Sequence, residues 1–151
     1  MSDKTMSPSK AKVAYNITGK APKPLGSYSH AVKAGGFLFV AGQGARNADT
    51  GEEAGVKTDA QGKILSYDIE VQTEAVIENL KVVLHEAGLR MEDLVDVTVF
   101  LADMQDFARY NKVYEKHFSF PDPPARTTVE VARLPGKNFI EIKATAFYPA
   151  E

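Results

Sequence analysis

The fold is decided by residues 68–101, DIEVQTEAVIENLKVVLHEAGLRMEDLVDVTVFL. The first part of this stretch predicts a helix from Asp68, as its N-cap, to about Ala87, because apolar residues recur there at helical spacing. Gly88 follows, at the position where a helix commonly ends in a left-handed residue. The second part predicts a strand, because the side chains of Val95–Leu101 alternate with a period of two. A helix that leads into a strand indicates a domain containing both.

The flanking segments predict four more strands and a second helix. Ser29–Val32 and Phe37–Ala41 are expected to form a hairpin, and the almost wholly apolar second strand is expected to be buried on both faces. The polar stretch 45–66 predicts a loop, with a small hairpin around 60–62. Further along the chain, the expected elements are a helix from Asp103 to about Phe118 and strands at Thr127–Val131 and Phe139–Phe147. The order ββ-α-β-α-ββ predicts an α+β sandwich, one sheet covered by two helices.

The composition of the chain excludes several classes of protein. The 151 residues contain no cysteine and three histidines, so disulfides, thiolate metal sites and cysteine nucleophiles are excluded. The net charge of -2 argues against a duplex-binding protein, and no apolar run is long enough for a membrane helix. No signal sequence is recognisable, so a cytoplasmic location is expected. Residues 1–20 are expected to be a flexible tail, followed by one domain over 21–151.

One face of the predicted sheet is left without a cover. Two helices of this length cover a single face, and the last strand places Phe139 and Phe147 with Glu141 and Lys143 on the other face. Large apolar side chains interleaved with charges predict that a second subunit closes this face, so a homo-oligomer is expected.

Two charged residues are the first candidates for chemistry. Arg126 follows Pro123 and Pro124 at the start of a strand, and a guanidinium held in place can grip a carboxylate with two hydrogen bonds. The alternative is a surface arginine paired with a nearby acid. Glu141 lies in the middle of a strand on the uncovered face, where it could act as a general acid or base or simply pair with Lys143 or Arg133.

Other candidates are weaker. Tyr28 lies in a turn and Asn111 lies off the apolar stripe of the second helix, so each could line a pocket or serve only packing or solvation. The backbone around Gly42 could donate hydrogen bonds to a ligand oxygen. His85 and His117 are expected to face solvent, and His30 could reach a pocket.

Motifs spread over residues 21–148 resemble those of the reactive intermediate deaminase family (RidA, also called YjgF). The segments that carry the resemblance are PLGSYSHAV (24–32), FVAGQ (39–43), QT (72–73), ENL (78–80), VTVFL (97–101), YNKVY (110–114), PAR (124–126), VEVARLP (129–135) and IEI (140–142). The resemblance implies a chorismate-mutase-like fold that forms a trimer with a central barrel. It also implies active sites between subunits and hydrolysis of imine or enamine acids to oxo acids and ammonia.

The resemblance also implies roles for individual residues. Arg126 would bind the substrate carboxylate and Glu141 would hold the attacking water. The remaining residues that would line the pocket are Tyr28, Asn111 and the backbones at Gly42 and Thr128. No metal, no organic cofactor, no nucleic acid and no membrane are implied, and trimers pairing into hexamers stay open.

Departures from the general pattern indicate a branch of the family. Thr127 and Thr128 follow Arg126, and the loop over 44–67 is long and polar, which is similar to 2-aminomuconate deaminases. That branch deaminates a six-carbon dicarboxylic enamine to 4-oxalocrotonate, and Arg46 is the predicted cation for a second carboxylate. The alternatives are a general 2-iminopropanoate/2-iminobutanoate deaminase, an RNA-cleaving protein and a non-catalytic ligand-binding protein.

Overall fold

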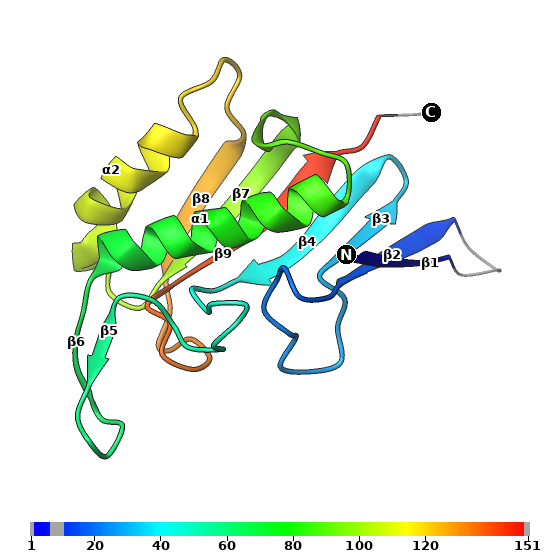
Figure 1. The fold of residues 1–151 in the computed structure, drawn as a ribbon. Helices are drawn as coiled ribbons and strands as arrows, with labels where there is room; N and C mark the ends of the chain where they lie inside the picture. Colours follow the sequence, from blue (N-terminus) through cyan, green and yellow to red (C-terminus); the bar gives the residue numbers. More distant parts are fainter. Residues whose placement is uncertain (1, 7–10, 150–151) are drawn as a thin grey trace.

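The computed structural model describes residues 2–6 and 11–149, which form one large sheet with two helices on one face (Figure 1). The order of the strands in this sheet is β1-β2-β3-β4-β9-β7-β8. β8 runs parallel to β7, whereas the other neighbouring pairs described are antiparallel. The strands are β1 Ser2–Met6, β2 Lys12–Ile17, β3 Ala31–Ala34, β4 Phe37–Gln43, β7 Leu94–Leu101, β8 Ala125–Glu130 and β9 Ile140–Phe147. The α+β architecture predicted from the sequence is confirmed.

Helix α1, Ile69–Glu86, begins and ends where the sequence predicts. The Asp68 carboxylate accepts hydrogen bonds from the backbone N–H groups of Glu70 and Val71, at 3.0 and 3.4 Å, which satisfies donors that the helix start leaves free. Gly88, with φ of 81°, allows the chain to turn out of the helix. The apolar stripe of α1 is fully buried against the sheet and includes Val76, Leu80 and Val83. Burial of each such side chain contributes about 1.5–3 kcal/mol.

The second helix begins one turn later than predicted. Asp103 accepts a hydrogen bond from the N–H of Gln105 at 2.9 Å and so caps a 3₁₀ turn, η2 Met104–Asp106. Helix α2 then runs over Phe107–His117 and buries Tyr110, Val113 and Tyr114. A further 3₁₀ turn, η1 Met91–Asp93, precedes β7.

The prediction of a flexible tail over residues 1–20 is wrong for most of its length. β2 pairs with β3, and β1 pairs with β2. Tyr15 and Ile17 lie in the core at 3% and 5% exposure. The polar residues around this segment concealed an alternation of apolar side chains with a period of two, which is the mark of a strand. Residue 1 and residues 7–10 of the predicted tail lie outside the described residues.

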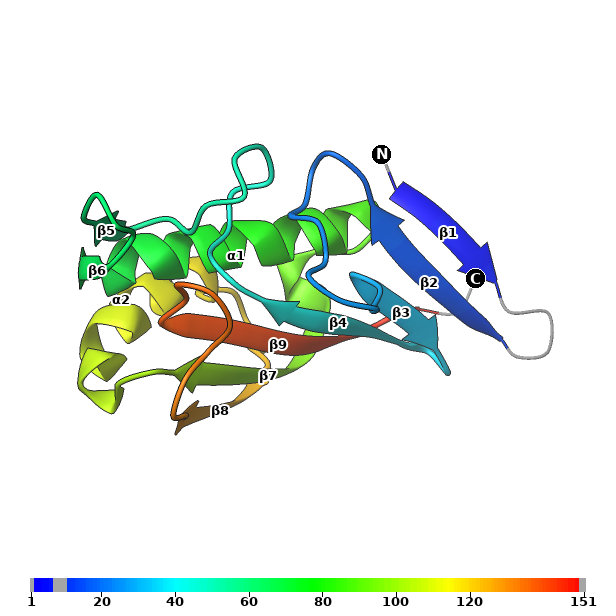
Figure 2. The same ribbon diagram turned by 90° about the horizontal axis from the view of Figure 1, so that it is seen from below.

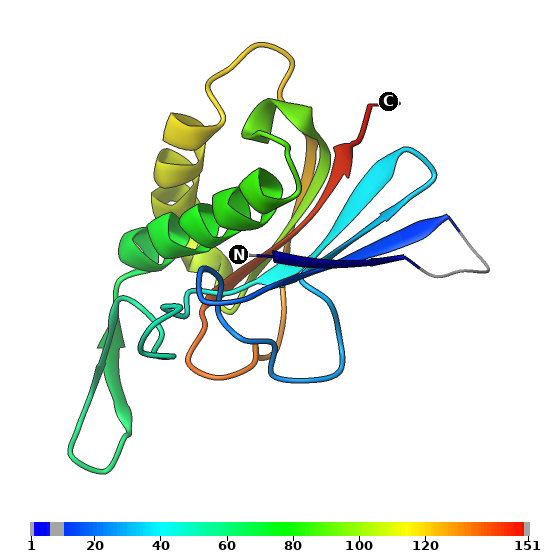
Figure 3. The same ribbon diagram turned by 45° about the vertical axis from the view of Figure 1, so that its right-hand side comes forward.

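Among the described residues, no helix covers the face of the sheet opposite α1 and α2, which is called here the open face (Figure 3). Leu38 and Val40 of β4 are fully buried under α1, whereas Phe37 and Phe39 are 40% and 44% exposed. The expectation that this strand is buried on both faces is therefore wrong for a single chain. Phe147 lies beside Phe37 with ring centroids 6.3 Å apart, so three phenylalanines form an exposed apolar cluster.

The polar stretch 45–66 contains the predicted small hairpin, made of β5 Val56–Thr58 and β6 Ile64–Tyr67. The hairpin projects from the end of the molecule at which β9 begins, while β9 itself lies between β4 and β7 (Figure 2). Among the described residues, no helix is long and apolar enough to cross a membrane.

Candidate functional site

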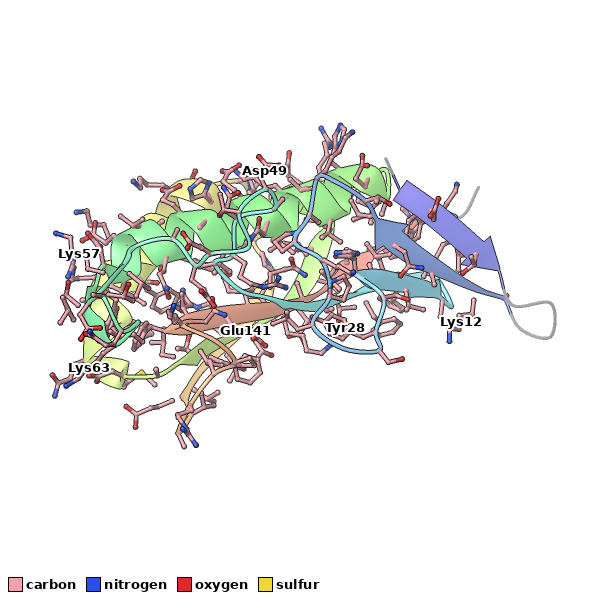
Figure 4. The ribbon with its side chains drawn as sticks, turned by 60° about the horizontal axis from the view of Figure 1, so that its bottom comes forward. Lys12, Tyr28, Asp49, Lys57, Lys63 and Glu141 are labelled. Carbon is pink, nitrogen blue, oxygen red and sulfur yellow. The ribbon has the colours of Figure 1, made fainter. Side chains whose placement is uncertain are left out.

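Glu141 lies in a hollow at the end of the sheet where β4 ends and β9 begins. The hollow has a volume of about 310 Å³, and Glu141 faces it together with backbone and side chains from three loops. Figure 4 shows Glu141 on β9 and Tyr28 on the loop before β3, in the middle of the molecule. The residues that line the Glu141 hollow are Leu25, Gly26, Tyr28, Gly42, Gly44, Arg46, Pro135, Asn138 and Glu141.

The carboxylate of Glu141 is half-buried and has no ion-pair partner among the described residues. The pairing with Lys143 or Arg133 that the sequence left open is therefore not formed. Burial raises the pKa of Glu141 above that of an ordinary glutamate, because the charged form loses water contacts. A carboxyl group whose pKa is raised by burial binds a proton more readily, which suits it to accept a proton and return it.

Gly42 lies directly against the Glu141 carboxylate. A Cβ atom at position 42 would collide with the side-chain oxygen of Glu141, so only glycine allows this approach. A Cβ at Gly44 would lie 2.8 Å from the amide oxygen of Asn138. The two glycines that end β4 therefore let the loop 135–138 and Glu141 pack against the strand.

Two buried amide side chains, Asn138 and Gln72, fix the loops around the hollow, and neither is among the site residues predicted from the sequence. The Asn138 side chain accepts from the N–H of Ala45 at 2.7 Å and donates to the carbonyl of Pro135 at 2.8 Å. Gln72, fully buried on α1, donates to the carbonyl of Lys137 at 2.9 Å and accepts from the N–H of Phe139 at 2.8 Å. The sequence signal that could have found them is an amide at a place expected to be apolar: Gln72 lies within the apolar stripe of α1, and Asn138 lies just before the apolar strand β9.

Two other predicted residues line the same hollow. The Tyr28 hydroxyl accepts from the N–H of Leu25 at 3.3 Å, and its side chain is 49% exposed. The Arg46 guanidinium donates to the carbonyl of Lys23 at 2.7 Å. Tyr28 and Arg46 thus form part of the wall near Glu141.

Arg126 lies in a second hollow, of about 540 Å³, between β8 and the C-terminal end of α2. Its guanidinium donates to the side-chain oxygen of Asn111 at 2.7 Å and lies 4.6 Å from the ring centroid of Tyr114. The Thr128 hydroxyl, two residues along the strand from Arg126, shares a 2.6 Å hydrogen bond with the hydroxyl of the buried Tyr110. No acidic side chain of the described chain forms an ion pair with Arg126, so its charge is held in place and stays available to an anion.

The structure does not bring Arg126 and Glu141 together within one chain. Arg126 pairs in register with Val97, which is buried beneath the helices. Glu141 pairs with Phe100, and its neighbours Ile140 and Ile142 point into the core, so Glu141 points to the open face. The two candidate residues therefore lie on opposite faces of the sheet.

His30 and His117 form hydrogen bonds within the fold, whereas His85 is exposed. His30 accepts from the N–H of Ile17 through Nδ1, so its Nε2–H donates to the carbonyl of Pro22 at 2.8 Å and the ring is neutral. His85 is exposed as predicted. The expectation that His117 faces solvent is wrong, because it lies between the helices with Nε2 2.8 Å from Glu74 and Nδ1 2.9 Å from the ammonium of Lys81.

One cluster of side chains in the described chain has the composition of a metal site. Ligand atoms of Glu74, Glu78 and His117 lie within 4.8 Å of one another, between α1 and α2. The ammonium of Lys81 lies 3.3 Å from Glu78 and also contacts His117, so a cation of the protein already balances the acidic groups. This cluster lies on the helical layer, away from Glu141.

Comparisons with known proteins identify what the chain is similar to. The family model described as Endoribonuclease L-PSP matches residues 18–148. A RutC family protein of Pyrococcus abyssi is 48% identical over 131 residues, which cover 87% of this chain and 94% of that protein. A Yersinia pestis protein of the Rid family has a TM-score of 0.79 at 34% identity, covering 91% of this chain and 99% of that one. Escherichia coli TdcF with bound serine has a TM-score of 0.75 at 33% identity, covering 89% and 98% respectively.

Proposed function

The chain belongs to the Endoribonuclease L-PSP family, which includes the Rid proteins, and on that premise we propose that it hydrolyses imines or enamines of small carboxylic acids to oxo acids and ammonia. Membership in the Rid family supports such a deaminase activity. The observation that carries the proposal for this chain is the half-buried Glu141, which has no ion-pair partner among the described residues and lies against the backbone of Gly42.

The reaction makes modest demands on the protein. An imine carbon is already electrophilic, so water adds to it while Glu141 accepts a proton from that water. Glu141 then returns the proton to the nitrogen of the carbinolamine. The proton of the carbinolamine hydroxyl then passes to the nitrogen as the C–N bond breaks, so ammonia leaves and the carbonyl of the oxo acid forms.

Arg126 is the proposed ligand of the substrate carboxylate. The hydrogen bond that Arg126 donates to Asn111 and the ring of Tyr114 hold the guanidinium in one orientation, which lowers the entropy cost of binding an acid. The serine bound to the related TdcF is itself a small carboxylic acid, which supports a ligand of this class.

A second copy of the chain is needed to complete the proposed site. A small substrate cannot touch Arg126 and Glu141 of one chain, because the sheet lies between them. We therefore propose that the open face, with its cluster of exposed phenylalanines, binds another copy and that the Arg126 side of that copy closes the Glu141 hollow. A trimer with sites between subunits satisfies this arrangement.

Mixing two inactive variants tests the composite site. Arg126→Ala and Glu141→Gln should each lose turnover of 2-iminopropanoate generated in situ, as measured by ammonia release. Unfolding the two together and refolding them as a mixture should restore part of the activity, because some interfaces then combine two intact halves. Mixed samples as inactive as each variant alone would contradict the composite site.

The finer proposal is that 2-aminomuconate is the substrate and 4-oxalocrotonate the product. The long polar segment 44–67 brings the positive charge of Arg46 to the lining of the Glu141 hollow, and a positive lining there supports a substrate with a second carboxylate. Side-by-side assays with 2-aminomuconate and 2-iminopropanoate decide between this activity and that of a general deaminase. The description of the family also suggests RNA cleavage, and RNA hydrolysis that survives both Arg126→Ala and Glu141→Gln would favour that activity instead.

A further inference from the structure

A third hollow lies on the open face and adjoins the hollow that contains Glu141. Its volume is about 730 Å³, and Gly26 and Tyr28 line both hollows. Lys12 and Lys143 also line it. This lining contains two lysines and no acidic residue, so the hollow is suited to an anion.

Lys143 is the cation of this hollow that lies nearest to Glu141 in sequence. The two residues are separated by one position on β9, so their side chains leave the same face of the sheet about 6.6 Å apart along the strand. Lys143 is exposed, and among the described residues it forms no ion pair and no hydrogen bond. Its register partner on β7 is the uncharged Thr98.

We propose that Lys143 binds the distal carboxylate of a dicarboxylic enamine or imine and so sets the preference of the enzyme for such substrates. This inference rests on the proposed function, because Glu141 defines where the reacting carbon lies. A six-carbon substrate with Arg126 of a second copy on its first carboxylate extends its other end past Glu141. Lys143 projects beside that path with a flexible side chain and a free ammonium.

Arg46 is the other cation near Glu141, and its situation differs. One nitrogen of its guanidinium already donates to the carbonyl of Lys23, and its backbone pairs with Glu53. Asn79 additionally holds the carbonyl of Arg46 at 2.9 Å. Arg46 is thus oriented toward Lys23 as part of the loop wall, whereas the side chain of Lys143 is free to follow the distal end of a substrate and has no hydrogen bond or ion pair among the described residues to give up.

The test compares two substrates on matched variants. For Lys143→Met, we expect KM for 2-aminomuconate to rise about 10- to 100-fold with kcat nearly unchanged, because one charge-assisted contact is lost. The constants for 2-iminopropanoate should stay as in the wild type. Lys143→Arg should restore most of the preference, and Lys63→Met, on the hairpin away from the hollow, is the control.

Each outcome has a defined meaning. An equal loss on both substrates, or no change on either, would overturn the role of Lys143. A rise in KM with Lys12→Met but not with Lys143→Met would also overturn it and assign the contact to the other lysine of the hollow. If the wild type hydrolyses neither substrate, the proposed function itself fails, and that result is distinguishable from the others.

Discussion

Gln72 offers a test of how the loop beside Glu141 is held in place. The side chain lies on α1, is fully buried, and bonds the carbonyl of Lys137 and the N–H of Phe139 at 2.9 and 2.8 Å. Phe139 is two residues before Glu141. Gln72→Leu keeps the approximate volume and removes both hydrogen bonds.

The expected cost follows from the two backbone groups left without partners. A buried donor or acceptor that loses its partner costs about 1–3 kcal/mol. Lys137 and Phe139 are themselves half-buried, so part of the cost is recovered by water. We therefore expect Gln72→Leu to lower the free energy of unfolding by about 2–4 kcal/mol, and the Tm by roughly 4–16 °C for a chain of this size.

Urea unfolding followed by circular dichroism measures this loss, with Gln61→Leu in the exposed turn of the β5–β6 hairpin as the control. The control should stay within about 0.5 kcal/mol of the wild type. Turnover by folded Gln72→Leu should also fall, since the loop that leads into Glu141 is no longer fixed. Unfolding of Gln72→Leu within about 0.5 kcal/mol of the wild type would refute the reasoning.

Three further predictions concern the site and the open face. Gly42→Ala should reduce kcat/KM by at least about tenfold by displacing the Glu141 carboxylate, whereas Gln61→Ala, in the exposed turn of the β5–β6 hairpin, should retain activity in the same ammonia assay. Because burial raises the pKa of Glu141, the wild type loses stability as the pH rises through the range between the ordinary and the raised pKa. Glu141→Gln should therefore be more stable than the wild type at about pH 8 and lose that advantage near pH 4. Urea unfolding at both pH values measures the difference in stability, and an equal difference at both would contradict the prediction. Phe39→Lys should dissociate the oligomer in light scattering and abolish deamination, while Leu65→Lys, on the exposed hairpin, should change neither.

The elements that the sequence predicts well are those with a local signature. The capped helix α1 and the alternating strand β7 carry their period in adjacent residues, so both were placed within about a residue of their observed bounds. Strand β2 is not predicted, because the polar and lysine-rich residues before it favour a flexible tail over the short apolar alternation that ends in Tyr15 and Ile17. The burial of those two side chains depends on pairing with β3, a contact that the sequence pattern does not contain.

The candidate site likewise contains features that local sequence patterns predict and features that depend on long-range packing. The direction of Glu141 follows from alternation along β9, so its place on the uncovered face could be predicted. The contacts of Arg126 could not, because Asn111 and Tyr114 reach it only through the packing of α2 on the sheet. The placement of Arg126 and Glu141 on opposite faces depends on the registers of β8 with β7 and of β7 with β9, which are long-range properties of the sheet.

The placement of Arg126 and Glu141 on opposite faces of one sheet has a consequence for the kinetics of the protein in solution. If each site joins halves from two copies, an isolated chain has binding groups but no catalytic power. Specific activity should then fall on dilution and recover on concentration, so that the dependence of rate on protein concentration is steeper than linear near the dissociation constant of the assembly. An activity assay carried out over a dilution series would thus report the strength of the subunit contact without any direct measurement of mass.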